Sequence, residues 1–568
     1  MSAVEAVRAA YARIAADDRP EVWITLRAER DVVAEAALLD ADPVRSALPL
    51  AGMTVAVKDN IDVAGLPTTA GCPAFAYTPR ESAPAVARLV AAGAIVLGKT
   101  NLDQFATGLV GTRSPHGAAR DARRPEYVSG GSSSGSAVAV ALGLVDLALG
   151  TDTAGSGRVP AAFGGIVGFK ATRGIVPVRG VVPACRTLDC VTVLAADLAG
   201  AERAMAIMAG PDAADPLSRP WPVDAPLAAP PAPRVAVPAA DQLGALTPAA
   251  RDAFASAATR LADAGAHLRT IDLAPFLEAA RLLYDGALVA ERHAAVGAFV
   301  DAHPDDVDPT VGAIVRAAGR VGATAYLADG ERVERLRVKA MAALGDADAL
   351  LLPTTTAQPT IAEVAADPIG VNGRLGIYTN FCNLFDLCGV AVPAGQADGG
   401  RFGVTVLARA FGDRVAADVA ALVTGTPPAP PADALGSPAV ALLVVGAHRR
   451  GQPLNHQLTE RGARFVATVD TAPAYRMYAL DTEPPKPGLV RVDDGGEPIE
   501  GELWQLPPAA LGTFLAALPA PMVLGPVRLA DGGTVVGFGC EPVAVVGAPD
   551  ITHHRSWPAY LASATPVG

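Results

Sequence analysis

Short apolar runs alternate with amphipathic segments over most of the first 400 residues. The run MTVAVKDNIDV at 53–63 predicts a buried strand that ends in a turn, and 83–102 predicts a helix, a glycine break and a strand. A helix followed by a strand returns at 137–155, and 346–360 predicts a further short strand. Helices are predicted upstream of these strands, over roughly the first 50 residues. This alternation indicates an α/β fold, a mixed β-sheet covered by helices.

Two proline-rich stretches differ in the segments that come after them. Residues 215–234 interrupt the α/β pattern, which resumes afterwards, and are interpreted as a surface excursion inside the large domain. Residues 425–438 (GTPPAPPADALGSP) have the composition of a linker, and the segments after them are strand-rich. A chain of 568 residues is too long for one core. We therefore predict an α/β domain at 1–424, a linker at 425–438 and a smaller, strand-rich α+β domain at 439–568.

Composition excludes several classes of partner. The net charge is −12 and the basic residues are scattered, so neither nucleic acid nor an anionic membrane surface is expected as a partner. The first residues do not resemble a secretory signal, and no apolar run reaches the roughly 18 residues of a membrane span. We therefore expect a cytoplasmic protein. Six thinly spread cysteines predict reduced thiols, and no histidine or cysteine spacing indicates a metal site, so no metal and no cofactor are expected.

A glycine- and serine-rich stretch can be either a linker or a rigid loop. GGSSSGS at 130–136 has linker composition, but an apolar helix is predicted directly after it. A second loop, GTDTAGSGRVP at 150–160, follows an apolar strand and also contains a serine. Upstream, Lys58 closes the apolar run MTVAV, whose residues would desolvate the ammonium group and lower its pKa. The ordinary alternative is that the Lys58 stem is buried while its ammonium group reaches water.

Together these three features resemble the amidase signature family, whose members use a Ser–Ser–Lys triad. The resemblance rests on VKDNIDV at 57–63, GGSSSG at 130–135 and GTDTAGSGRVP at 150–160, with 24 residues from the first serine to the second. It implies that Ser156 attacks the amide carbonyl, that Ser132 relays the proton, and that Lys58 is the base and must be neutral. The stretch at 130–136 is then an active-site loop rather than a linker.

The family resemblance also implies an oxyanion hole next to the nucleophile. Its donors would be the backbone N–H groups of Thr153, Ala154, Gly155 and Ser156. Gly131 is assigned to the substrate-binding residues on the same resemblance. Small residues suit such loops because the backbone must come close to the substrate. Asp152 and Arg158 flank the nucleophile and are interpreted as structural residues.

A predicted helix at 281–299 (RLLYDGALVAERHAAVGAF) carries the candidate specificity residues. Tyr284 and Arg292 lie about two turns apart on it, roughly on one face. An arginine that faces an apolar pocket can bind a carboxylate through two hydrogen bonds, and a tyrosine hydroxyl can add a third. The alternative is an exposed Arg292 paired with Asp285 or Glu291, and a tyrosine packed in the core.

Several stretches resemble the allophanate hydrolases in particular. They are 67–77, 281–299 and 378–395, together with 445–480, which is similar to the γ-glutamylcyclotransferase-like domain of those enzymes. The resemblance implies hydrolysis of allophanate, a small ureide with a free carboxylate, to N-carboxycarbamate and ammonia, and then loss of carbon dioxide. His456 is the candidate for the second step. The region expected to carry the cyclotransferase acid, 514–522, has none.

Three other functions remain open at the level of sequence. A general amidase for neutral or aryl amides would keep the triad but give Arg292 no role. The amidase-type component of a tRNA-dependent amidotransferase is disfavoured by the C-terminal domain, and a non-catalytic scaffold by the intact triad. Because no carboxylase region is recognised, a separate urea carboxylase or triazine-degrading enzyme is expected to supply allophanate. The family resemblance also suggests a homodimer.

Overall fold

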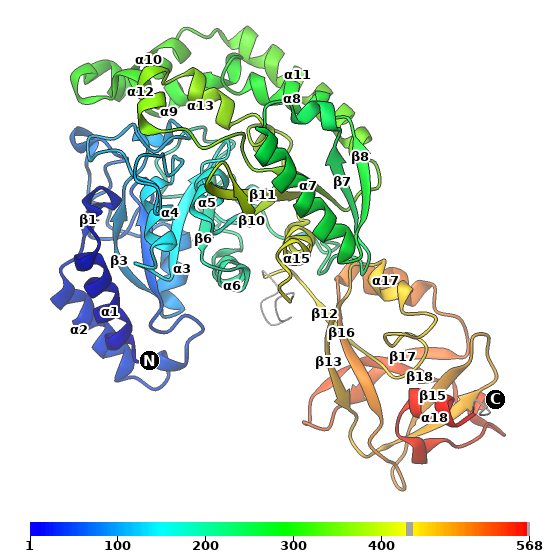
Figure 1. Ribbon diagram of the computed structural model, residues 1–568. Coiled ribbons are helices and arrows are strands. Elements are labelled where there is room, and N and C mark those ends of the chain that lie inside the picture. The colour runs from blue at the N-terminus through cyan, green and yellow to red at the C-terminus, as the bar shows by residue number, and fades with distance from the viewer. Residues whose placement is uncertain (428–435, 565–568) are drawn as a thin grey trace. The chain divides into compact units, whose positions relative to one another are not determined.

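The chain forms two compact units, which are considered separately. The computed structural model describes residues 1–427 and 436–564 (Figure 1). The larger unit comprises Met1–Pro220 and Ala232–Ala429, and the smaller comprises Trp221–Pro231 and Pro430–Gly568. Most of the predicted linker, 428–435, lies outside the described residues. Among the helices that are described, none is both long and apolar enough to cross a membrane.

A mixed sheet of 11 described strands is the core of the larger unit. In spatial order the strands are β1 (Trp23–Leu26), β3 (Ile95–Thr100), β2 (Thr54–Lys58), β4 (Leu147–Asp152), β6 (Cys190–Ala195), β5 (Val167–Lys170), β10 (Cys388–Ala397), β11 (Gly400–Ala408), β9 (Ala349–Pro353), β7 (Arg234–Pro238) and β8 (His267–Ile271). Strand β2 is parallel to β3 and β4, whereas β4, β6, β5, β10, β11 and β9 follow one another in antiparallel pairs. The structure confirms the predicted mixed α/β class.

Helices cover this sheet (Figure 1). They are α1 (Ala3–Ala16), α2 (Glu29–Asp40), α3 (Pro84–Ala91), α4 (Ser134–Ala141), α5 (Arg158–Gly164), α6 (Leu198–Met208), α7 (Pro248–Asp263), α8 (Ala274–Leu282), α9 (Ala290–Ala302), α10 (Pro309–Ala318), α11 (Ala323–Leu344), α12 (Ile361–Ala366), α13 (Gly370–Leu375), α14 (Phe381–Leu384) and α15 (Asp413–Thr424). Helix α4, rich in alanine and valine, packs with α1, α2 and the strands in one core cluster. Its burial explains why an apolar segment directly follows the Gly/Ser stretch.

Two adjacent strands bring the sequence motifs together. Every residue of β2 and of β4 is buried, as expected for near-continuous apolar runs in the middle of a sheet. The two strands are parallel, with Val57 opposite Leu149. Their carboxyl ends therefore lie at the same edge of the sheet. Lys58 is the last residue of β2, and the loop that carries Ser156 follows the end of β4.

The predicted continuous helix at 281–299 is wrong. Helix α8 ends at Leu282 and α9 begins at Ala290, with a turn and the short 3-10 helix Ala287–Val289 between them. Gly286 lies in this break, where a Cβ atom would be 2.6 Å from the carbonyl oxygen of Leu282. Asp-Gly pairs favour turns, and the strong helix formers around this pair concealed that signal.

The smaller unit is strand-rich, in line with the predicted α+β fold. Its five-stranded sheet has the order β13 (Arg464–Asp470), β16 (Glu500–Leu506), β12 (Val440–Val444), β18 (Thr534–Cys540), β17 (Met522–Arg528). A hairpin of β14 (Tyr475–Leu480) and β15 (Lys486–Arg491) and the helices α16 (His456–Thr459), α17 (Pro508–Ala516) and α18 (Trp557–Ala564) complete it.

Part of the first proline-rich stretch belongs to the smaller unit. Residues 221–231 lie within 215–234, which the sequence pattern placed in the large domain. The backbone N–H of Leu227 donates to the carbonyl of Gly462 at 2.9 Å, and Arg464 Nε donates to the carbonyl of Leu227 at 2.7 Å. A proline-rich segment without periodicity carries no signal for such long-range contacts, so the sequence could not indicate them.

Candidate active site

Lys58 and Ser132 are in direct contact at the carboxyl end of β2. Nζ of Lys58 lies 2.7 Å from Oγ of Ser132 and 2.7 Å from Oγ1 of Thr151. Ser132 is fully buried and follows a cis peptide bond from Gly131, just before α4. The structure therefore brings together two of the three residues in the predicted triad.

Lys58 is fully buried, so the alternative in which its ammonium group reaches water is wrong. Burial lowers the pKa of Lys58 to about 7, against the opposing effect of the carboxylates of Asp103, Asp189 and Asp152. No salt bridge within 4 Å compensates its charge in the described part of the chain. A lysine in this state is half neutral near pH 7 and can act as a base.

Ser156 lies in the adjacent loop. Its hydroxyl donates to the carbonyl of Gly108 at 3.4 Å, and its own carbonyl accepts the N–H of Ser133 at 3.1 Å. The second hydrogen bond ties the loop after β4 to the start of α4, one residue from Ser132. All three predicted triad residues are thus held at one edge of the sheet.

Asp152 holds the loop that carries Ser156. Its carboxylate accepts the backbone N–H groups of Gly155, Gly157 and Arg158 at 2.8, 3.1 and 3.2 Å, and two side-chain N–H groups of Arg158 at 2.9 Å each. Burial raises the pKa of Asp152, but the Arg158 guanidinium more than offsets this and keeps it below its ordinary value. Both residues therefore act within the loop, as the sequence interpretation expected.

The loop offers fewer free N–H groups than predicted. The N–H of Gly155 is already bound to the Asp152 carboxylate and is not free for an oxyanion. The N–H groups of Thr153, Ala154 and Ser156 make no hydrogen bond within the described residues. These three remain available as oxyanion donors, whereas Gly155 supplies conformational freedom, with φ of 123°.

Gly131 is confined by its neighbours. A Cβ atom at this position would clash with Oδ2 of Asp103 and would lie 2.6 Å from the backbone nitrogen of Gly111. The same Asp103 oxygen accepts the N–H of Gly111 at 3.0 Å. Close packing of two loops therefore requires glycine at this position. This requirement is separate from the substrate-binding role predicted for Gly131.

Arg292 and Tyr284 meet although the helix between them is broken. Nη2 of Arg292 donates to the Tyr284 hydroxyl at 3.0 Å. Arg292 is only 1% exposed, and Glu291 instead accepts hydrogen bonds from Thr187 and Tyr326, so the alternative of an exposed, salt-bridged Arg292 is wrong. Nε of Arg292 is buried and has no partner among the described residues. A buried guanidinium with a free N–H is suited to bind an anion.

The Arg292 guanidinium and the Ser156 hydroxyl belong to the same site. Nη1 of Arg292 donates to Oγ1 of Thr107 at 2.9 Å, and Gly108, the next residue, accepts the Ser156 hydroxyl. Because consecutive Cα atoms are about 3.8 Å apart, these contacts place a cation close to the hydroxyl. Burial lowers the pKa of Arg292, but Tyr284, Cys185 and Asp189 raise it further, so the charge is retained.

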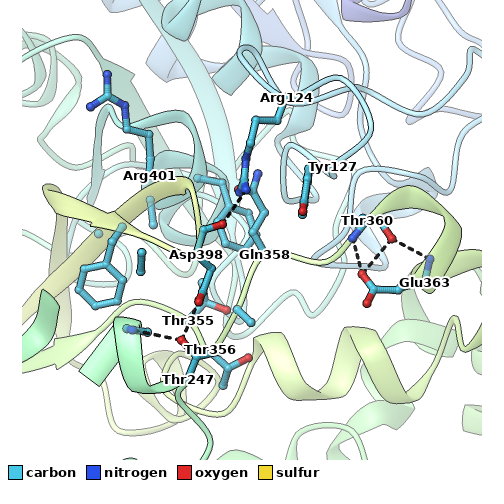
Figure 2. Close-up of a pocket in the computed structure, with 17 residues that line it drawn as sticks. Arg124, Tyr127, Thr247, Thr355, Thr356, Gln358, Thr360, Glu363, Asp398 and Arg401 are labelled. Carbon is cyan, nitrogen blue, oxygen red and sulfur yellow. Dashed lines mark hydrogen bonds between the residues drawn. The ribbon is translucent and has the colours of Figure 1, made fainter. Parts of the chain in front are cut away.

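A separate cavity of about 250 Å³ lies in the larger unit, and no triad residue lines it (Figure 2). Arg124 stacks 3.8 Å above the Tyr127 ring and donates to the Gln358 side chain and to the carbonyl of Asp398. Thr247 donates to the Asp398 carboxylate at 2.7 Å (Figure 2). The polar groups are thus largely paired with each other, and this cavity adds no group to the site. Elsewhere among the described residues, no cluster of His, Cys, Asp and Glu could hold a metal ion.

In the smaller unit the structure favours a different histidine from the predicted one. His456 is exposed, with Nδ1 2.9 Å from the carbonyl oxygen of Pro453. His448 is 6% exposed, stacks on Phe538, and lines a cavity of about 410 Å³ together with Arg461 and Lys486. Burial lowers the pKa of His448, so the imidazole is neutral at neutral pH. The available signal was its position at the end of the apolar run AVALLVVGA, since strand ends often carry functional groups.

Comparison with known proteins gives two family matches and close structural relatives. Residues 5–415 match the family "Amidase", and residues 440–562 match "Allophanate hydrolase C-terminal domain". The allophanate hydrolase of Kluyveromyces lactis superposes with a TM-score of 0.88 at 38% identity, over 100% of this chain and 97% of that one. The urea amidolyase of Saccharomyces cerevisiae is 41% identical over 95% of this chain.

The relatives differ in length and name. The chain spans 31% of the length of the Saccharomyces cerevisiae urea amidolyase. The 2-amino-5-chloromuconic acid deaminase of Comamonas testosteroni is 34% identical, but over only 66% of this chain and 81% of that one. The match to the K. lactis enzyme, in contrast, extends through both units. With its amidase match over more than two thirds of its length, and a second match at its C-terminus, the chain belongs to the amidase family and carries an allophanate hydrolase C-terminal domain.

Proposed function

We propose that this chain hydrolyses allophanate to N-carboxycarbamate and ammonia, and that its C-terminal domain then releases carbon dioxide. The observation that supports this most directly is the buried Arg292, whose free Nε–H lies in the same site as Ser156. A general amidase acting on neutral amides would have no use for a buried cation there. The similarity to the K. lactis allophanate hydrolase over the whole chain supports the same substrate.

In the proposed reaction, neutral Lys58 accepts the proton of Ser132 while Ser132 accepts that of Ser156. Ser156 Oγ attacks the terminal amide carbon of allophanate, and the C–N bond to the NH₂ group breaks. The proton returns along the same path to the leaving nitrogen, and ammonia departs. Water then cleaves the acyl-enzyme in the same way and releases N-carboxycarbamate. Burial of Lys58 matters because it makes a neutral base available near pH 7.

The remaining groups bind the substrate at its two ends. The N–H groups of Thr153, Ala154 and Ser156 are the proposed donors to the oxyanion, while that of Gly155 stays with Asp152. Arg292 binds the substrate carboxylate through Nε and a neighbouring nitrogen, and the Tyr284 hydroxyl orients the guanidinium. The substrate is thereby fixed with its amide carbonyl toward Ser156.

We place the decarboxylation step at the cavity beside His448 rather than at His456. In this step the N–C bond of one carboxyl group breaks, carbon dioxide leaves, and the nitrogen takes up a proton. N-carboxycarbamate carries two negative charges, and Arg461 and Lys486 in the cavity wall would offset them. The buried imidazole is the residue best placed to orient the intermediate.

Two features of the biological setting are also proposals. Allophanate would come from a urea-carboxylating activity, because some of the matching relatives are named urea amidolyases; an enzyme that opens a triazine ring is the other source. The protein is proposed to act as a homodimer in the cytoplasm.

Ammonia release by the purified protein tests the proposed function. Allophanate is compared with biuret, malonamate and a neutral aryl amide, and Ser156→Ala is the blank. A strong preference for allophanate and malonamate, the two substrates with a carboxylate, supports the proposal. Turnover of neutral amides with none of allophanate would place the chain among the general amidases.

A further inference from the structure

We infer that Asp189 is a positioning residue for the hydrolysis step: it fixes the loop of Ser156 and links this loop to the start of helix α9, which carries Arg292. The inference rests on the proposed function, in which Ser156 is the nucleophile and Arg292 reads the substrate carboxylate. Asp189 itself contacts neither of these residues directly. It acts through Thr153 on one side and through the preceding segment 184–188 on the other.

The Asp189 carboxylate is held by uncharged donors alone. It is 6% exposed and accepts the hydroxyl of Thr153 at 2.5 Å and the backbone N–H groups of Ala184 and Cys185 at 2.9 and 3.2 Å. None of the described lysines or arginines forms a salt bridge with it. A buried carboxylate without an ionic partner is costly unless its hydrogen bonds are well formed, so these contacts constrain one another. Thr153 is consequently held in one orientation.

Thr153 opens the loop that carries the proposed oxyanion donors. Its side chain is bound to Asp189, while its backbone N–H is free among the described residues. A second contact ties the same loop to the segment before β6: Nδ2 of Asn383 donates to the carbonyls of both Asp152 and Leu188, each at 2.7 Å. The end of β4 is therefore linked through Asn383 to residue 188, and the first residue of the loop is bound to residue 189.

The other end of the segment is bound to α9. Thr187 donates to the carboxylate of Glu291 through its backbone N–H at 3.0 Å and its hydroxyl at 2.6 Å, and Tyr326 donates to Glu291 at 3.0 Å. Glu291 is the neighbour of Arg292 in the first turn of α9. Residues 187–189 thus connect the loop that supplies the oxyanion donors with the residue that binds the carboxylate. Such a connection fixes the distance between the two ends of the substrate.

The two halves of this connection have different kinetic consequences. Loss of the Asp189–Thr153 contact loosens the oxyanion donors, which act in the transition state, so kcat falls for every amide while KM changes little. Loss of the Thr187–Glu291 contact loosens Arg292, so KM rises for substrates with a carboxylate and stays unchanged for neutral amides. A role in stability alone would not separate the two parameters in this way.

The decisive experiment compares Asp189→Asn, Thr153→Val and the double variant in the full-length chain. We expect kcat to fall roughly 10–100-fold in each single variant, with KM within about threefold of wild type, and the double variant to be no slower than the slower single variant. Thr153→Val keeps the shape of the side chain and the buried carboxylate, so it still tests the inference if Asp189→Asn does not fold.

The matched control is Asp215→Asn. Asp215 is 4% exposed and accepts backbone N–H groups of Val178, Arg179 and Leu217 at 2.6, 3.1 and 3.0 Å, but it does not contact the loop of Ser156. It should lose stability as Asp189→Asn does and keep its kcat. If Asp189→Asn and Thr153→Val keep kcat within about twofold of wild type, or if Asp215→Asn lowers kcat equally, Asp189 has no positioning role.

A second readout separates this inference from the proposed substrate. A fluorophosphonate forms a covalent bond with an activated serine as fluoride leaves, and its phosphoryl oxygen needs the same oxyanion donors. Labelling of Ser156 should slow in Asp189→Asn and Thr153→Val in proportion to kcat. If wild type labels rapidly but does not hydrolyse allophanate, the substrate assignment fails while the role of Asp189 is still measured. Equal labelling rates in wild type and variants would overturn the role itself.

Discussion

Methionine in place of Lys58 should abolish ammonia release and yet make the folded protein more stable at neutral pH. The pKa of Lys58 falls from 10.5 to about 7 because the residue is buried. At about 1.4 kcal/mol per pKa unit, this difference costs folding about 5 kcal/mol when the pH is 7 or below. Methionine removes that cost but loses the contacts with Ser132 and Thr151, at about 1 kcal/mol each. The expected net gain is about 3 kcal/mol.

The sign of the pH dependence follows from where the proton is bound. Between about pH 7 and 10.5 the unfolded chain keeps the Lys58 proton and the folded chain does not. The free energy of unfolding of wild type therefore rises through this window. The advantage of Lys58→Met is largest at pH 7 and below and shrinks as the pH rises toward 10.5.

Urea unfolding at about pH 6, 7.5 and 9 measures both the stability gain of Lys58→Met and its dependence on pH. Lys99→Met is the matched control. Lys99 is also fully buried, but it forms a salt bridge with Asp59 at 3.0 Å. Its replacement leaves an unpaired buried carboxylate and should destabilise the protein by about 3–5 kcal/mol. A Lys58→Met variant that is destabilised as much as Lys99→Met would show that Lys58 is a structural cation.

Kinetics provide the second half of this test. If Lys58 must be neutral, kcat/KM of wild type rises with an apparent pKa of about 7 and increases about tenfold between pH 6 and 8. Activity is lost as the pH falls because the base becomes protonated. A profile that is flat over this range would refute the assignment of Lys58 as the base.

Three further predictions concern specificity and the C-terminal domain. Arg292→Ala should lower kcat/KM for allophanate by about 2–4 kcal/mol and leave neutral amides unaffected; an equal loss on both would make Arg292 structural. His448→Ala should leave ammonia release intact and slow carbon dioxide formation, whereas His456→Ala should change neither rate. Carbon dioxide formation can be followed by ¹³C NMR with labelled allophanate. A chain ending at residue 427 should still release ammonia; a folded but inactive product would contradict this.

The segments that carry Lys58, Ser132 and Ser156 could be singled out from the sequence because each is a short motif beside an apolar run. A lysine that closes a fully apolar strand, and serines in glycine-rich loops next to apolar segments, each have an ordinary explanation, and the resemblance to the amidase signature family is what indicated a common site. Lys58 ends β2 and the loop of Ser156 follows β4; the alternation of strands and helices predicted both strands, but only the structure shows that they are parallel neighbours. Sequence could not show that Gly155 directs its N–H to Asp152, because that depends on loop geometry.

The predictions that the structure overturns depend on long-range contacts, or on a weak local signal that the neighbouring residues outweighed. Gly286 breaks the predicted helix, yet Arg292 and Tyr284 still meet because Thr107 and the α9 packing hold the guanidinium from outside the helix. His448 and His456 lie eight residues apart in one motif, and periodicity does not distinguish them. The buried one, His448, packs on Phe514 and Phe538, which both lie far along the chain.

The buried carboxylates around Lys58 raise its pKa against the effect of burial, and the net value is about 7. Burial lowers the pKa, and a base with too low a pKa removes protons poorly. Three carboxylates oppose this effect, those of Asp103, Asp189 and Asp152. Each of them also accepts backbone N–H groups from a loop of the site. The same acids therefore hold the loops in place and adjust the base, so a substitution such as Asp103→Asn should loosen a loop and also move the acidic limb of the pH profile to lower pH.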